Sequence, residues 1–132
     1  MDSLVLHDCL ALALAGKLSF PETVKRMNAI GVERYRADLV RMEKTHYGYA
    51  GEAYAEHFEL QQAPEIPSSF SPELVRHALT RVQTGEIQYA EFLRRIMSAG
   101  VAEYGVWLEG RKAIYSGRNG DFYIEPFPNT KE

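Results

Sequence analysis

The stretch GVERYRADLV at residues 31–40 returns 69 residues later as GVAEYGVWLE at residues 100–109. With this offset, residues 4–58 align with 73–127 without a gap. A constant offset of this kind indicates an internal duplication. The identical pairs include Gly16 with Gly85, Glu22 with Glu91, Gly51 with Gly120, Tyr54 with Tyr123 and Glu56 with Glu125. We predict a single domain over residues 1–132, with repeat one at about 3–59, a Pro/Ser linker at about 60–71 and repeat two at about 72–128.

Each repeat is predicted to contain two helices followed by a three-stranded meander. Ser71, Pro72 and Glu73 are typical of a helix start, and Gly85 suits the position after a helix end. Ser19 and Glu22 fit a capping box that starts a second helix. The expected strands alternate at about 35–39, 43–46 and 52–56, and again at about 104–108, 112–115 and 121–125. The fold class is therefore α+β, with both halves sharing one core about a pseudo-twofold axis.

Composition narrows the range of functions. The 132 residues carry 15 Lys and Arg against 18 Asp and Glu, a net charge of -3. A general nucleic-acid binder or a polybasic membrane anchor would show a basic excess. No apolar run reaches the roughly 20 residues that span a bilayer. The lone Cys9 excludes an internal disulfide. We predict a cytoplasmic protein with a reduced thiol and neither nucleic acid nor membrane as a partner.

The third strand of each repeat carries an acid-Tyr-acid row. The rows are Glu52, Tyr54 and Glu56, and Asp121, Tyr123 and Glu125. Strand alternation predicts that Phe122 and Ile124 face the core, so that the rows face solvent or a cleft. Glu52 and Glu56 would stand about 13 Å apart along one strand, too far for a hydrolytic carboxylate pair, which needs about 5–9.5 Å. A wet sheet face and a binding cleft both stay open as interpretations.

Aromatic residues suggest further candidate positions. Tyr47 and Tyr115 flank the two predicted hairpin loops, Gly48–Gly51 and Gly117–Gly120, and exposed tyrosines are common on binding surfaces. Trp107 breaks the symmetry because Asp38 occupies its place in repeat one. It is expected to point away from the core, either as an interface anchor or as a cover for the second sheet face. Tyr35 and its equivalent at position 104 are expected to face inward.

Metal and nucleophile chemistry find little support in the sequence. The four histidines form no i, i+4 pair of the kind that binds zinc on a helix. Cys9 lies among leucines, where a thiol acts as a small hydrophobe. We therefore predict no catalytic residue, no metal and no cofactor.

The chain resembles the YbcV-like family of small uncharacterised proteins from enteric bacteria and their prophages, some of them labelled phage envelope proteins. The resemblance covers nearly the whole chain and rests on residues 31–40, 85–92, 99–104, 117–121 and 125–128, with Lys44, Thr45, Gly51 and Glu52. His46 departs from it, since an aromatic residue is expected there. The resemblance implies no activity, cofactor or catalytic residue.

Two functional hypotheses follow. The leading one is a non-enzymatic binding or protein-interaction domain that uses a Tyr- and acid-rich sheet face, with a second copy of itself or another protein as partner. The alternative is a small-molecule-binding domain or hydrolase with a cleft between the repeats. A cleft requires acids and tyrosines of both repeats to converge, whereas an interaction domain requires an exposed patch.

Overall fold

The computed structural model describes residues 1–127. It contains α1 (Ser3–Leu14), α2 (Phe20–Ala29), β1 (Val32–Asp38), β2 (Glu43–Gly48), β3 (Ala53–His57), α3 (Pro72–Gln83), α4 (Tyr89–Ser98), β4 (Val101–Trp107), β5 (Lys112–Gly117) and β6 (Phe122–Pro126). Two helices followed by three strands occur twice, so the predicted α+β duplication is confirmed. The predicted end of repeat two, at about residue 128, lies outside the described residues.

The six strands form one antiparallel sheet in the order β3-β2-β1-β4-β5-β6. The first strands of the two repeats meet at its centre, where Arg36 pairs with Gly105, its own equivalent in the other repeat. The pairs Arg34–Trp107 and Asp38–Glu103 are also related in this way, because Glu103 is the equivalent of Arg34 and Trp107 that of Asp38. A pseudo-twofold axis therefore passes between β1 and β4.

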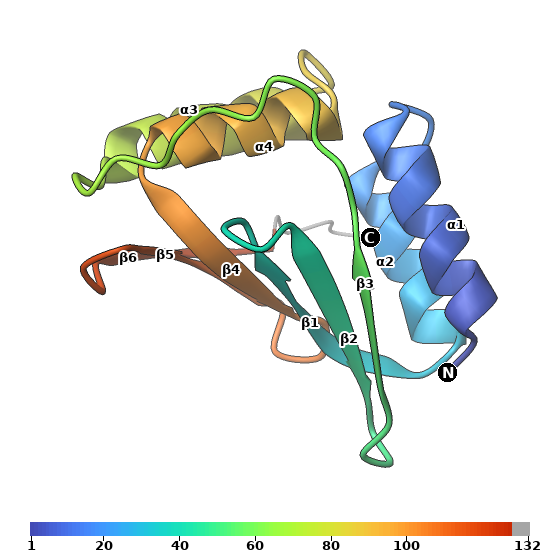
Figure 1. Ribbon diagram of the computed structural model, residues 1–132. Coiled ribbons are helices and arrows are strands. Elements are labelled where there is room, and N and C mark those ends of the chain that lie inside the picture. The colour runs from blue at the N-terminus through green and yellow to red at the C-terminus, as the bar shows by residue number, and fades with distance from the viewer. Residues whose placement is uncertain (128–132) are drawn as a thin grey trace.

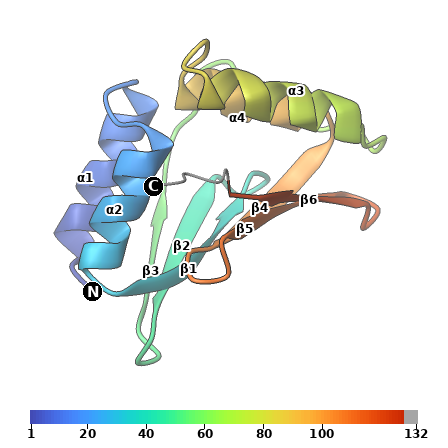
Figure 2. The ribbon, with the colours of Figure 1, turned by 180° about the vertical axis from the view of Figure 1, so that it is seen from behind.

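Both helix pairs cover the same face of this sheet, and the other face carries no helix in the described chain (Figures 1 and 2). The alternating burial of β1, β2, β4 and β5 follows from this layering. Tyr35 and Tyr104 point toward the helices and are buried, as predicted. Both repeats contribute to one apolar core beneath the helices.

The linker packs against repeat two. Ser71 donates from its backbone nitrogen to the carbonyl of Ala99 at 2.9 Å, while Ile66 and Phe70 pack on the core. Gly100 has φ +104°, and a Cβ built on it would lie 2.1 Å from the carbonyl oxygen of Ser69. Glycine at position 100 thus allows the linker to cross the start of β4.

The side chains of the two edge strands point opposite to our prediction. Phe122 is 62% exposed and Ile124 is 46% exposed, whereas Tyr123 is half-buried against the core. Directly paired residues share a face, and Tyr123 pairs with Tyr115, which lies in the core. Apolar character alone misled the prediction, because an edge strand can leave large apolar side chains on the helix-free face.

Candidate functional site

The acid-Tyr-acid rows lie on β3 and β6, which form opposite edges of the sheet. Five strand spacings of about 4.8 Å put them roughly 24 Å apart. The rows therefore do not meet in one cleft, and each has its own surroundings.

In repeat one, the row is held by contacts close to it. His7 Nδ1 of α1 lies 2.8 Å from Glu56 Oε1, and this hydrogen bond raises the pKa of His7. Glu52 is exposed at the hairpin, where its carboxylate accepts from the backbone nitrogen of Ala50 at 3.0 Å. Tyr54 is half-buried on the helix side. These contacts stabilise the strand and its hairpin.

In repeat two, the row also faces the helices. The Tyr123 hydroxyl donates to Glu125 Oε1 at 3.0 Å, and Asp121 is exposed at the hairpin. Tyr115 is only 4% exposed, and its ring stacks on that of Tyr104 at 5.1 Å. Its assignment to a binding surface was wrong, because it belongs to the core.

Tyr47 and Trp107 lie on the helix-free face. The Arg34 guanidinium stands 4.0 Å from the centre of the Tyr47 ring. The Trp107 indole folds over Gly105, where a Cβ would lie 2.7 Å from the ring. Trp107 points outward as predicted and covers part of the second sheet face.

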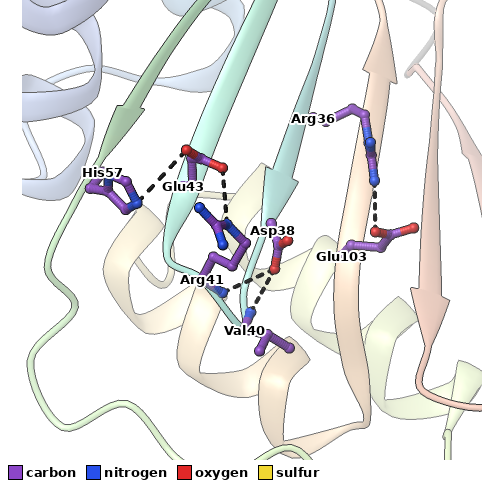
Figure 3. A network of polar contacts seen from close by, with 7 residues as sticks. All are labelled: Arg36, Asp38, Val40, Arg41, Glu43, His57 and Glu103. Carbon is purple, nitrogen blue, oxygen red and sulfur yellow. Dashed lines mark hydrogen bonds and ion pairs between the residues drawn. The ribbon is translucent and has the colours of Figure 1, made fainter.

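The repeat-one half of this face is charged, and its charges are paired (Figure 3). Arg36 donates to Glu103 at 2.7 Å across the junction of the repeats. Glu43 contacts Arg41 at 3.3 Å and His57 at 3.7 Å. The charged side chains of Arg36 and Glu43 on this half are therefore already paired.

The repeat-two half carries large apolar side chains beside polar ones such as Lys112. The Trp107 indole over Gly105 lies beside Ile114, because Gly105 pairs with Ile114. Ile114 in turn pairs with Ile124 of β6. We call Trp107, Ile114, Phe122, Ile124 and Pro126 the repeat-two patch. Its equivalents in repeat one are Asp38, Thr45, Ala53, Ala55 and His57.

A further group lies on the opposite face, beneath the helices, and the sequence analysis proposed only its Glu56 as a site residue. We call Tyr35, Lys44, His46, Glu56, Tyr89 and Tyr104 the inner polar cluster. Lys44 and His46 are 4% and 1% exposed, although both types usually reach water. The signal was the repeat alignment, which places Ala113 and Tyr115 at these two positions.

The inner polar cluster combines both repeats. Lys44 Nζ lies 4.7 Å from the ring centre of Tyr35 and 4.8 Å from that of Tyr89. The hydroxyls of Tyr89 and Tyr104 are hydrogen-bonded to each other. Burial, followed by the nearby charge of Lys44, lowers the pKa of His46 to about 3, so its imidazole is neutral at pH 7.

Other features of the described residues offer less chemistry. A hollow of about 430 Å³ lies along α3 and α4, but its Arg94 and Arg95 are paired with Glu91. Burial raises the pKa of the Cys9 thiol, which keeps it protonated. Within residues 1–127, no group of three His, Cys, Asp or Glu could hold a metal ion, and no helix is long and apolar enough to cross a membrane.

A family model described as a protein of unknown function (DUF1398) matches residues 14–126. The chain belongs to this family. The match includes most of repeat one, the linker and nearly all of repeat two, so both sheet faces described above lie within it. No curated protein matches the chain.

Proposed function

We propose that the chain is a protein-interaction domain that binds a second copy of itself through the edge of β6 and the repeat-two patch. The observation that carries this proposal is the exposure of Phe122 and Ile124 on an edge strand. Large apolar residues on an open strand edge favour pairing with another strand.

The backbone of β6 supports such pairing. Gly117 donates to the carbonyl of Asp121 at 2.8 Å, and Phe127 donates to that of Arg111 at 3.0 Å. Hydrogen bonding to β5 therefore uses the odd-numbered residues of β6. Because the directions of the backbone hydrogen bonds alternate along a strand, the amide and carbonyl groups of Phe122 and Ile124 point away from β5, in the plane of the sheet. They are available to a strand of the second copy.

The strand is complementary to itself. In an antiparallel pair centred on Ile124, Phe122 faces Pro126 of the second copy and Ile124 faces its own equivalent. On the inner face, Tyr123 faces Glu125 of the second copy, a pairing of the kind already present within one chain at 3.0 Å. No like charges oppose each other, as an isologous interface requires.

Two features set the strength of this dimer. Pro126 has no amide proton, so it ends the ladder after few hydrogen bonds. The interface is consequently small, and we expect a dissociation constant in roughly the micromolar range. The edge of β3 offers a similar backbone, but Ala53 and Ala55 replace the large side chains.

Sedimentation velocity between about 10 µM and about 1 mM tests the proposal. We expect the wild type to approach twice its 15.0 kDa mass as concentration rises. Ile124→Lys should raise the dissociation constant at least about tenfold, because two ammonium groups would oppose each other. Ala55→Lys is the matched control and should dimerise like the wild type. A wild type that stays monomeric throughout, or equal effects of both variants, would overturn the proposal.

From the motif resemblance we also propose that the chain is one of the YbcV-like proteins of prophages and acts in the cytoplasm. Its single buried cysteine is compatible with a reducing compartment. Cell fractionation is the direct measurement, and recovery outside the cytoplasm would contradict the assignment.

A further inference from the structure

The inner polar cluster holds the buried Lys44, which forms no ion pair with any carboxylate of the described residues. Lysine is almost never fully buried unless it is paired. The Lys44 ammonium lies over the rings of Tyr35 and Tyr89 and forms no ion pair within residues 1–127. Glu56 stands directly opposite on β3, but its Oε1 is bonded to His7 instead.

Two neighbours of Lys44 also have polar atoms without partners. Both ring nitrogens of His46 are buried and unbonded, as is Oε2 of Glu56. His46 lies two residues from Lys44 on the same strand face, and its ring contacts that of Tyr35 at 5.1 Å. Buried polar atoms are nearly always hydrogen-bonded, so each orphan requires an explanation.

Repeat two shows that the fold itself does not require these polar groups. At the positions of Lys44 and His46 it has Ala113 and Tyr115, both buried. There the Tyr115 ring packs against Phe92 and Tyr104 as ordinary core. The same backbone is thus built with an apolar interior in one half, and the unpaired polar atoms of the other half point to a ligand.

We infer that the inner polar cluster binds a small oxyanion that carries a hydroxyl group. Its anionic oxygens would accept from the Lys44 ammonium and from the N–H of the neutral His46. Its hydroxyl would donate to Glu56 Oε2. A hydroxyl is needed there because this carboxylate oxygen would repel another anionic oxygen of the ligand. Hydrogen phosphate and α-hydroxy carboxylates have this pattern of acceptors and one donor.

Of the tyrosines in the cluster, one is partly exposed and gives the side from which a ligand would enter. Tyr35 and Tyr104 are buried, whereas Tyr89, the first residue of α4, is half-buried. We therefore place the entrance beside Tyr89. This site is independent of the proposed dimer, because the β6 edge and the repeat-two patch contain none of its residues.

Isothermal titration calorimetry with inorganic phosphate, glycolate and acetate tests the inference. We expect saturable binding of phosphate and glycolate to the wild type, and weaker binding of acetate, which lacks the hydroxyl. Lys44→Met should weaken binding about tenfold or more through loss of a charge-assisted contact. Lys112→Met, at an exposed position on the helix-free face, is the control and should bind like the wild type.

A thermal unfolding series separates binding from a purely structural role. Without ligand, Lys44→Met should melt at or above the wild-type temperature, because it removes a buried unpaired charge. Added phosphate should raise the melting temperature of the wild type but not of the variant. Should Lys44→Met fail to fold, the double variant Lys44→Ala with His46→Tyr, which copies repeat two, replaces it. A wild type that binds neither phosphate nor glycolate, or a variant that binds as tightly, would overturn the inference.

Discussion

The two repeats have the same backbone fold, but their side chains differ in character on both faces of the sheet. Repeat one has a polar interior at Lys44 and His46, and paired charges on the helix-free face. Repeat two has an apolar interior at Ala113 and Tyr115, with large apolar side chains on the open face. A sheet with one covered face usually has an apolar interior and a polar open face. Repeat one departs from this pattern in its interior, and repeat two departs from it on the open face.

This difference separates what the fold needs from what one repeat has added. Backbone features occur in both halves, such as the positive φ of Met42 and of its equivalent Arg111, at 53° and 55°. Neither is glycine, so the turn geometry at this position is imposed by the fold. Features present in one half alone, such as Lys44 or Phe122, have no such structural reason and are the places to look for binding.

The largest expected change in stability distinguishes two equivalent glycines, one in each repeat. Gly31 and Gly100 both have positive φ, but a Cβ on Gly31 meets nothing within 4 Å, whereas one on Gly100 meets Ser69 O at 2.1 Å. Gly100→Ala should lower the free energy of unfolding by about 4 kcal/mol, because backbone must move. Gly31→Ala should cost only about 1 kcal/mol. Urea denaturation measures both, and equal losses would show that the linker does not distinguish the repeats.

The second-largest expected effect is a pH dependence of stability that arises from the buried His46 of repeat one. Folding lowers the pKa of His46 from 6.5 to about 3, so below pH 6.5 the unfolded chain binds a proton that the folded chain does not. The free energy of unfolding should therefore fall by about 1.4 kcal/mol per pH unit, or about 3 kcal/mol between pH 6.5 and pH 4. His46→Tyr, the repeat-two residue, should remove this part of the pH dependence. Parallel stability curves for wild type and variant would contradict a buried neutral imidazole.

Much of the architecture was predictable because duplication shows each signal twice. The order of helices and strands, the capping box at Ser19 and the glycines after the helices all follow from local patterns. β1 and β4 begin earlier than predicted, at Val32 and Val101, since strand pairing extends beyond the alternating stretch.

The faces of the edge strands required pairing information that a local pattern lacks. The apolar Phe122 and Ile124 suggested an inward face, but the register with Tyr115 decides the orientation. The burial of Lys44 was equally hidden, because an isolated lysine in a strand is normally solvent-facing. In the sequence, the only sign of an internal position was its alignment with Ala113 of repeat two, and the packing of the helices over the sheet confirms it.

The smallest expected effect compares the starts of two equivalent helices. Ser19 Oγ accepts from the Glu22 nitrogen at 3.3 Å, and Glu22 Oε1 accepts from the Ser19 nitrogen at 2.9 Å. Gln88, at the same position of α4, makes no side-chain cap hydrogen bond. Ser19→Ala should cost about 1 kcal/mol, and Gln88→Ala should stay within about 0.5 kcal/mol of the wild type.

The reason for this difference lies in how repeat two uses the acid that matches Glu22. Glu91 accepts from Arg94 at 2.9 Å and from Arg95 at 3.0 Å, so it does not reach back to the helix start. Urea denaturation of both variants is the measurement. A loss for Gln88→Ala as large as for Ser19→Ala would have to come from packing, because the Gln88 side chain lies against Gly16. In that case the contact between the repeats, and not the missing cap, would account for the sequence difference at this position.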